Sequence, residues 1–183
     1  MYKRQALNEA MDVVENMSAR SDVKPDVVTF TTLIRGWCKR GDMEMATKVF
    51  DLASKMNVVP DVVSYTTVIR GWCERGCEDR AIKVMKQMKE AGVRPDVVTF
   101  TTLIRSYCKN KNMSAAMSVL DVMRESGLRP NDRTYTTLIQ GWIELKKMDR
   151  AMDLFKKMKR NKRVRPNICL LYTSDAADER HGV

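Results

Sequence analysis

The sequence predicts an all-α fold, a solenoid of stacked helix–turn–helix repeats, and a recurring stretch is the first indication. The stretch PDVVTFTTLIR begins at Pro25 and returns unchanged at Pro95, with near-copies beginning at Pro60 and Pro130, so the interval is always 35 residues. A fixed period of about 20 to 50 residues is typical of a solenoid. Apolar residues also follow helical spacing twice in each repeat, and only 8 glycines and 5 prolines occur in 183 residues, which favours helices.

The repeat boundaries follow from the Pro-Asp or Pro-Asn pair that closes each copy. Each repeat is taken to begin directly after such a pair, which predicts one partial repeat, four full repeats and a non-repeat tail. The fourth full repeat carries one extra residue near positions 162–163. The predicted boundaries are 1–26 for the partial repeat, 27–61, 62–96, 97–131 and 132–167 for the full repeats, and 168–183 for the tail.

The first full repeat shows why two helices are expected in each. Its first apolar stripe has members at i, i+3, i+4, i+7 and i+8, and a second stripe follows a break at Gly41 and Asp42. Thr29, just before the first stripe, is expected to cap the first helix. The closing proline prevents the second helix from continuing. The stripes are Phe30, Leu33, Ile34, Trp37 and Cys38, then Met43, Ala46, Val49 and Phe50.

The composition indicates a binding protein rather than a catalyst. Cys38, Cys73 and Cys108 stand at the same place in successive repeats, which favours buried free thiols in a reducing compartment. The only histidine is His181, so a zinc site, a Cys–His nucleophile and a histidine base all lack residues. No glycine-rich phosphate loop occurs, and no apolar run approaches the about 20 residues of a membrane span. We therefore predict no catalytic residue, metal, cofactor, small-molecule substrate or membrane partner.

One face of each first helix avoids the apolar stripe. Positions 2, 5, 9 and 13 of a repeat lie three or four residues apart and share that face, which keeps threonine at position 5 of all four repeats. A plain solvated helix face, or duplication of one ancestral repeat, would give the same pattern. The four faces read Val28, Thr31, Arg35 and Lys39; Val63, Thr66, Arg70 and Glu74; Val98, Thr101, Arg105 and Lys109; and Arg133, Thr136, Gln140 and Glu144.

The unit VVTFTTLIRGWCKRGDMEMATKVFDLASKMNVVPD, with its helix pair and terminal Pro-Asp, resembles the pentatricopeptide repeat of the P class. The resemblance covers residues 1–167. The tetratricopeptide repeat has a period of about 34 residues and lacks the closing Pro-Asp. The pentatricopeptide resemblance implies a right-handed superhelical α-solenoid that binds single-stranded RNA, one base per repeat, in the mitochondrion or chloroplast. It also implies a part in processing, stabilisation or translation of an organelle transcript.

The resemblance further implies which residues read the bases. Positions 5 and 35 of each repeat would select the base, and position 2 would flank it. A carboxylate at position 35 accepts from the ring N–H of guanine or uracil, whereas an amide NH₂ donates to the ring nitrogen of adenine or cytosine. By resemblance, threonine at position 5 favours the purine, which gives 5′-GGAA-3′. The base-selecting pairs are Thr31 with Asp61, Thr66 with Asp96, Thr101 with Asn131, and Thr136 with Asn167, and the flanking residues are Val28, Val63, Val98 and Arg133.

The position-35 residues have an alternative role, since an aspartate or asparagine there can form a turn or cap the next helix. Both roles are compatible. The chain carries a net charge of +10, which fits an acidic partner. The residues placed for phosphate contacts are Arg35, Arg70 and Arg105, with Lys39 and Lys109 one turn further along.

The last residues do not continue the repeat. The stretch CLLYTSDAADE resembles the conceptual translation of a sequencing adapter, and a natural acidic tail is the alternative. On the first interpretation the chain is a fragment of a longer reading frame, and its start says nothing about targeting. Two other functions stay open: a protein-binding helical scaffold, and a parent protein that carries a nuclease or deaminase domain beyond the repeats.

Overall fold

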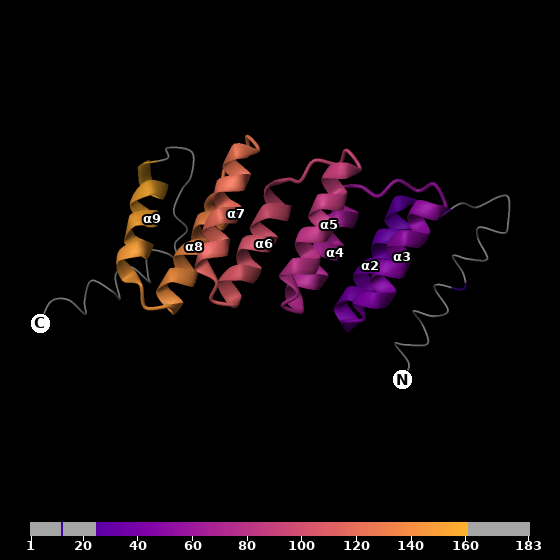
Figure 1. The fold of residues 1–183 in the computed structure, drawn as a ribbon, viewed down its shortest axis with the longest axis horizontal. Helices are drawn as coiled ribbons and strands as arrows, with labels where there is room; N and C mark the ends of the chain where they lie inside the picture. The colour runs from indigo at the N-terminus through magenta and orange to yellow at the C-terminus, as the bar shows by residue number, and fades with distance from the viewer. Residues whose placement is uncertain (1–11, 13–24, 161–183) are drawn as a thin grey trace, which may run out of the picture. The chain divides into compact units, whose positions relative to one another are not determined.

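The computed structural model describes residue 12 and residues 25–160, and these contain eight helices and no strand (Figure 1). Most of the predicted partial repeat, Asn167, the extra residue near 162–163 and the tail lie outside the described residues. The helices are α2 (Val27–Arg40), α3 (Met43–Lys55), α4 (Val62–Glu74), α5 (Glu78–Glu90), α6 (Val97–Lys109), α7 (Met113–Glu125), α8 (Asp132–Glu144) and α9 (Met148–Arg160).

The chain forms two compact parts, Met1–Thr102 and Leu103–Val183, which divide within α6. In the first part α2 packs on α3, α4 packs on α5, and α4 also contacts both helices of the preceding pair. In the second part α8 packs on α9 and also contacts α7. Helix pairs therefore recur along the sequence at the interval that the repeat predicted.

An aspartate or asparagine begins each first helix. Asp26 is the N-cap of α2, and its Oδ1 accepts from the backbone N–H of Thr29 at 2.8 Å and from the Thr29 hydroxyl at 2.7 Å. These two hydrogen bonds lower the pKa of the Asp26 carboxyl. The prediction that Thr29 caps this helix is therefore wrong, because the helix starts at Val27 and Thr29 is the donor to the cap.

The turn inside a repeat has its own geometry. Gly41 closes α2 with a φ of +78°, in the left-handed region that a glycine adopts without strain. Asp42 and Asn112 cap α3 and α7 through their side-chain oxygens, each accepting a backbone N–H at 3.1 Å. Cys77, which precedes α5, forms no such side-chain cap.

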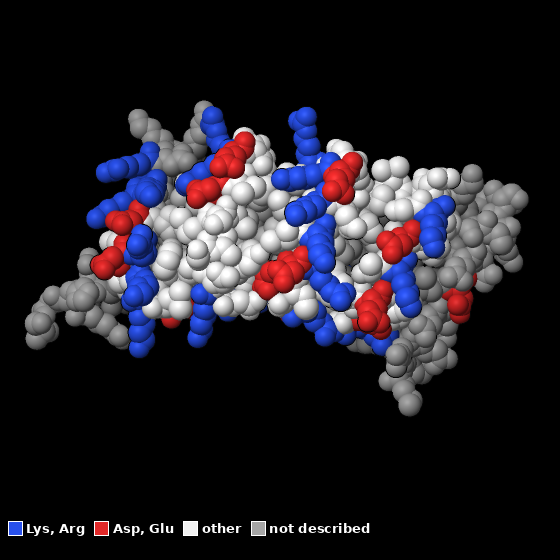
Figure 2. Space-filling model, in the orientation of Figure 1, with Lys and Arg blue, Asp and Glu red and all other residues white. Residues whose placement is uncertain are grey.

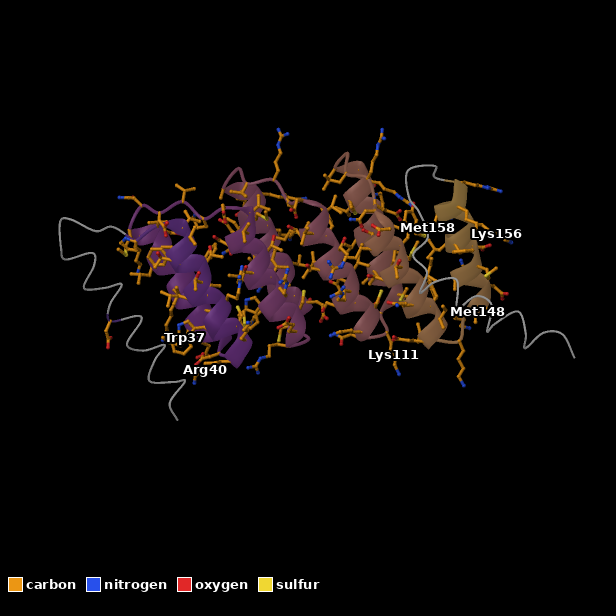
Figure 3. The ribbon with its side chains drawn as sticks, turned by 180° about the vertical axis from the view of Figure 1, so that it is seen from behind. Trp37, Arg40, Lys111, Met148, Lys156 and Met158 are labelled. Atoms are coloured by element: carbon orange, nitrogen blue, oxygen red, sulfur yellow. The ribbon has the colours of Figure 1, made fainter. Side chains whose placement is uncertain are left out.

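The predicted apolar stripes form the core of the first part. Phe30, Ile34 and Trp37 of α2 are buried, as are the second-stripe residues of α3. Phe50 and Tyr65 join successive repeats with an edge-to-face ring contact at 4.9 Å. The guanidinium of Arg40 lies 5.2 Å from the Trp37 ring centroid (Figure 3).

A second core lies in Leu103–Val183 and uses the same residue types. Its members share nearly complete burial, and Met158 of α9 points into it (Figure 3). Methionine fills irregular gaps in such cores, which accounts for part of the high methionine content. The buried residues are Ile104, Cys108, Met113, Ala116, Leu120, Tyr135, Leu138, Ile139, Ala151, Leu154, Phe155 and Met158.

Glycine at position 10 permits close contact between successive repeats. A Cβ built on Gly71 would lie 2.6 Å from Met43 Sδ and 2.7 Å from Cys38 Sγ, both in the preceding repeat. Gly141 meets Met113 and Cys108 in the same way, with Met113 Sδ at 2.7 Å. Real Cβ atoms do not approach sulfur this closely, so a side chain at Gly71 or Gly141 would displace the methionine and cysteine side chains beside it.

Candidate nucleic-acid interface

The position-2 valines stand at the start of each first helix with their side chains open to solvent. Val28 is 69% exposed, and Val63 and Val98 are each 52% exposed. Arg133, which replaces valine in the fourth repeat, is exposed as well. An apolar side chain that recurs at one exposed place is available to contact the flat face of another molecule.

The position-35 residues serve as helix caps, as one of the two interpretations predicted. Asp61 Oδ1 accepts from the backbone N–H and the hydroxyl of Ser64, both at 2.8 Å. Asp96 makes the same pair of bonds to Thr99, also at 2.8 Å. Asn131 Oδ1 accepts from the backbone N–H of Thr134 at 3.0 Å and from its hydroxyl at 2.9 Å.

Capping uses only one of the two polar atoms that each of these side chains carries. Within residues 25–160, the second carboxylate oxygens of Asp61 and Asp96 accept no hydrogen bond, and Nδ2 of Asn131 donates none. Because the cap requires an acceptor, it holds the Asn131 oxygen inward and leaves its NH₂ group on the other side. The aspartates therefore present an acceptor where Asn131 presents a donor.

The position-5 threonines are more enclosed than the sequence predicted. Thr31, Thr66 and Thr101 are each only 6% exposed, and Thr136 is half-buried. The position-5 side chains therefore do not form an open helix face, and Thr31 and Thr66 each contact the next repeat. The Thr31 hydroxyl lies 2.7 Å from the Ser64 hydroxyl, and the Thr66 hydroxyl lies 2.8 Å from that of Thr99.

Positions 5 and 35 of one repeat meet at a third residue, position 3 of the next repeat. Ser64 contacts Thr31 and donates to Asp61, and Thr99 contacts Thr66 and donates to Asp96. Sequence reasoning missed this residue. A signal was present, since position 3 carries a hydroxyl in all four repeats, at Thr29, Ser64, Thr99 and Thr134.

Arginine stands at position 9 of the first three repeats. Arg35, Arg70 and Arg105 are exposed and form no ion pair with any residue of 25–160, and the same holds for Lys39 and Lys109. On the face shown in Figure 2, lysine and arginine side chains stand in groups, with acidic side chains beside several of them. Unpaired guanidinium groups are suited to phosphate oxygens.

Of the three position-12 cysteines, Cys108 is buried as predicted, whereas Cys38 and Cys73 are only half-buried. Burial raises the pKa of Cys38 to about 11 and that of Cys108 to about 12, and the charges of Glu74 and Glu144 act in the same direction. Cys73 and Cys77 take part in no disulfide within the described residues. No group of three or more His, Cys, Asp or Glu side chains that would hold a metal occurs in the described part of the chain.

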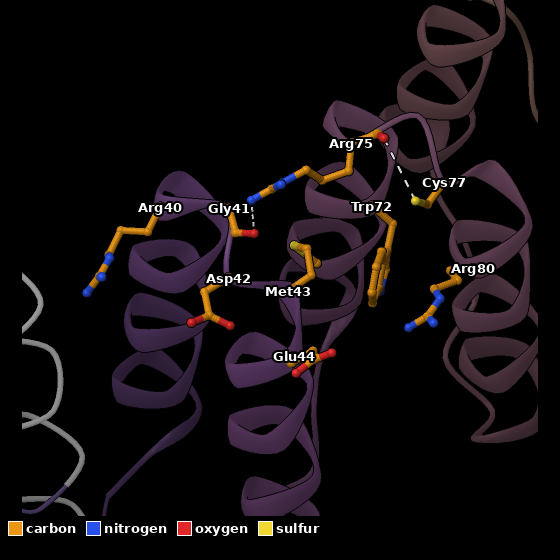
Figure 4. A pocket seen from close by; sticks show the side chains of 9 residues that line it. All are labelled: Arg40, Gly41, Asp42, Met43, Glu44, Trp72, Arg75, Cys77 and Arg80. Carbon is orange, nitrogen blue, oxygen red and sulfur yellow. Dashed lines mark hydrogen bonds between the residues drawn. The ribbon is translucent and has the colours of Figure 1, made fainter.

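A hollow lies at the other end of the helices, between the turn after α2 and the turn after α4 (Figure 4). The Arg75 guanidinium donates to the Gly41 carbonyl across it, and Arg80 lies 4.7 Å from the Trp72 ring centroid. None of the predicted RNA-contacting residues lines it. Its lining is Arg40, Gly41, Asp42, Met43, Glu44, Trp72, Arg75, Cys77 and Arg80.

The repeats match a known family along most of the described chain. Residues 25–74, 60–109 and 95–144 match the PPR repeat family, and residues 133–162 match the PPR repeat. The chain belongs to the pentatricopeptide repeat family. The predicted family and the predicted class of fold, an all-α helical-repeat solenoid, are thereby confirmed.

Individual relatives agree with this assignment. A pentatricopeptide repeat-containing protein of Arabidopsis thaliana is 33% identical over 49 residues, which are 27% of this chain and 10% of that protein. The crystal structure of the maize pentatricopeptide repeat protein PPR10 superposes with a TM-score of 0.70 at 29% identity, covering 87% of this chain and 23% of that one. This chain therefore spans a small part of these relatives' length.

Two further solved structures contain RNA. PPR10 in complex with an 18-nt psaJ RNA element matches with a TM-score of 0.74 at 27% identity, covering 85% of this chain and 23% of that one. The PPR domain of the Arabidopsis thaliana protein-only RNase P 1, in complex with tRNA, matches with a TM-score of 0.71. That domain is 16% identical, over 97% of this chain and 92% of the domain, and shares the fold alone. No described helix is both long enough and apolar enough to cross a membrane.

Proposed function

We propose that this chain binds single-stranded RNA in a sequence-specific manner, with one base facing each repeat boundary. The observation that carries the proposal is the paired arrangement at positions 5 and 35. At each of the first two boundaries a threonine and an aspartate share one hydroxyl partner, and the aspartate keeps an outward oxygen. The RNA-bound PPR10 structure, at 27% identity, supports RNA as the partner.

The outward atom at each boundary gives the proposed base order. Asp61 and Asp96 present acceptors, which match the ring N–H of guanine. Asn131 presents an NH₂ donor, which matches the ring nitrogen of adenine. With Thr136 and Asn167 assigned by the repeat pattern, the proposed sequence is 5′-GGAA-3′.

The remaining exposed residues fit the same ligand. Val28, Val63 and Val98 would lie between successive bases, and a guanidinium plane at Arg133 can stack in the same way. The unpaired Arg35, Arg70 and Arg105 would contact phosphates, with Lys39 and Lys109 beside them. This arrangement offers binding groups only, so we propose a non-enzymatic role for these repeats, in processing, stabilisation or translation of a mitochondrial or chloroplast transcript.

A competition binding experiment tests the proposal. The chain is mixed with a labelled RNA that contains 5′-GGAA-3′, and unlabelled RNAs of scrambled pyrimidine sequence compete. We expect the GGAA competitor to displace the label at a concentration at least about tenfold lower, since each mismatch loses hydrogen bonds to a polar group. Equal displacement by both RNAs, or no RNA binding at low salt, would favour a protein-binding scaffold instead.

A further inference from the structure

The hydroxyl of Thr99 stands between the two residues assigned to the second base. It lies 2.8 Å from the Thr66 hydroxyl and 2.8 Å from Asp96 Oδ1. Thr99 is fully buried and Thr66 is nearly so. The side chains of Thr66, Thr99 and Asp96, from two successive repeats, therefore form one short chain of hydrogen bonds.

Counting the hydroxyl protons shows which group donates and which accepts in each of these hydrogen bonds. A carboxylate oxygen only accepts, so Thr99 gives its single hydroxyl proton to Asp96. The Thr99 oxygen then has no proton for Thr66 and accepts the Thr66 proton instead. Thr66 consequently keeps only oxygen lone pairs for any group that approaches it from outside.

We propose that Thr99 is a positioning residue for base selection, which turns Thr66 into a hydrogen-bond acceptor at the second base. The inference rests on the proposed RNA-binding function and gives a physical cause for the purine preference proposed there. A free threonine hydroxyl would donate or accept equally and would not separate bases by polarity.

An acceptor-only threonine discriminates bases at one particular edge. On the C2 side of the base, guanine carries an amino donor, adenine a C–H, and uracil and cytosine a carbonyl oxygen. An acceptor placed there is favourable for guanine, neutral for adenine and repelled by both pyrimidines. On the opposite side it would favour adenine and cytosine together, which is not a purine preference. Because guanine is the base proposed at this boundary, we place the Thr66 oxygen on the C2 side.

The boundary between the first and second full repeats has the same chain of hydrogen bonds, with one difference. Ser64 contacts Thr31 at 2.7 Å and donates to Asp61, but the Thr31 hydroxyl also lies 2.7 Å from the Val27 carbonyl. The proton of Thr31 has two internal acceptors, so it stays inward even without Ser64. This relay, in which the position-3 hydroxyl accepts the threonine proton, therefore matters more for the orientation of Thr66 at the second boundary than for that of Thr31 at the first.

The test uses the whole chain and short RNAs that contain GGAA and differ only at its second base. Inosine replaces guanine there, because it keeps the ring N–H and lacks the C2 amino group. We expect the parent chain to bind guanine about three- to tenfold more tightly than inosine. In Thr99→Val, which removes the hydroxyl and keeps the shape and the backbone cap, the ratio should fall toward one.

Three controls separate positioning from folding. Thr99→Ser restores the hydroxyl and should restore the ratio, as serine already stands at position 3 in Ser64. Thr102→Val removes a hydroxyl from the same helix whose bond goes only to the Val98 carbonyl, at 2.8 Å, and should change nothing. Ser64→Ala should alter the guanine-to-inosine ratio at the first base less than Thr99→Val does at the second. Thr99→Ala takes the place of the valine variant if circular dichroism shows that the latter unfolds.

Each outcome has a distinct meaning. A Thr99→Val chain that keeps the parent ratio within twofold would overturn the relay. A parent that prefers GGAA over pyrimidine RNA but binds guanine and inosine equally would overturn the acceptor assignment and leave the proposed function standing. A parent without preference for GGAA would remove the proposed function itself.

Discussion

Asn131 differs from Asp61 and Asp96 by one outward group, an amide NH₂ in place of a carboxylate oxygen. We predict that Asn131→Asp moves the preference at the third base from adenine to guanine, by on the order of 1–3 kcal/mol, because a charged acceptor replaces a donor. The cap survives, since the inward oxygen is kept and the two residues cap about equally well. Competition binding with RNAs that differ only at the third base measures the change.

A matched control exists for this substitution. Asn112 caps α7 through the same oxygen but lies inside a repeat. Asn112→Asp should therefore leave the base preference unchanged at every position. If Asn131→Asp keeps adenine preferred, the reading role of Asn131 is wrong, and capping is its only function.

The half-buried thiol of Cys38 and the buried thiol of Cys108 give a prediction that does not depend on RNA. The pKa of Cys38 is raised from 9.0 to about 11, so its thiolate fraction at pH 8 is about 100-fold below that of a free thiol. Iodoacetamide should therefore label Cys38 and Cys108 slowly in the folded chain and rapidly in urea, as mass spectrometry can follow. Equal rates in both states would show that these thiols are open.

The same pKa shifts fix a direction for stability at high pH. The folded-state pKa values of Cys38 and Cys108 lie above the unfolded value of 9.0. Their contribution is therefore complete below about pH 8 and declines as the pH rises from 9 toward 11 for Cys38 and toward 12 for Cys108. Cys38→Ala should weaken that decline in thermal melts, and an unchanged pH profile would contradict the assignment.

At the level of helices, a substitution at Gly71 can test the close contact between α4 and the preceding repeat. Alanine normally stabilises a helix interior by up to about 1 kcal/mol relative to glycine. Here the added Cβ would meet Cys38 Sγ and Met43 Sδ, so we predict that Gly71→Ala lowers the free energy of unfolding by roughly 1–3 kcal/mol. Denaturant titration measures it. Adding Cys38→Ala should recover part of the loss, and its failure to do so would place the strain elsewhere.

The helices were predictable from the sequence because their stripes depend on spacing within one repeat. Phe30, Ile34 and Trp37 are buried as the period of 3.6 residues required. The start of α2 was not predicted well, since Asp26 and Thr29 are both good capping residues and only the structure shows which one accepts. The hydrophobic periodicity predicts which face of a helix is buried, but it does not predict which residue caps the helix.

The candidate site was predictable only in part. The exposed valines at position 2 and the exposed arginines at position 9 lie where the helix face placed them. The burial of Thr31 and Thr66 was not foreseen, because it depends on how closely the next repeat approaches. That distance is set by small residues such as Gly71, whose effect on a neighbouring repeat no pattern within one repeat reveals.

For the molecule as a whole, the arginine row predicts a strong dependence of binding on salt. Each phosphate contact releases a counterion, so the logarithm of the affinity should fall linearly with the logarithm of salt concentration. Arg70→Gln, which copies the neutral residue of the fourth repeat, should weaken binding equally for all RNA sequences and reduce that slope by about one. A slope identical to that of the parent chain would exclude Arg70 from phosphate contact.

The proposed double duty of the position-35 residues, as helix caps and as base-selecting groups, has a consequence for how such repeats evolve. Aspartate and asparagine codons differ by one nucleotide, and both residues start the following helix about equally well. One transition in the gene would thus exchange an acceptor for a donor at Asp61, Asp96 or Asn131 without disturbing the fold. Most other replacements at these positions would remove a helix cap, at about 1 kcal/mol. Selection on stability alone would therefore favour an exchange that, in the proposed code, changes which base is preferred.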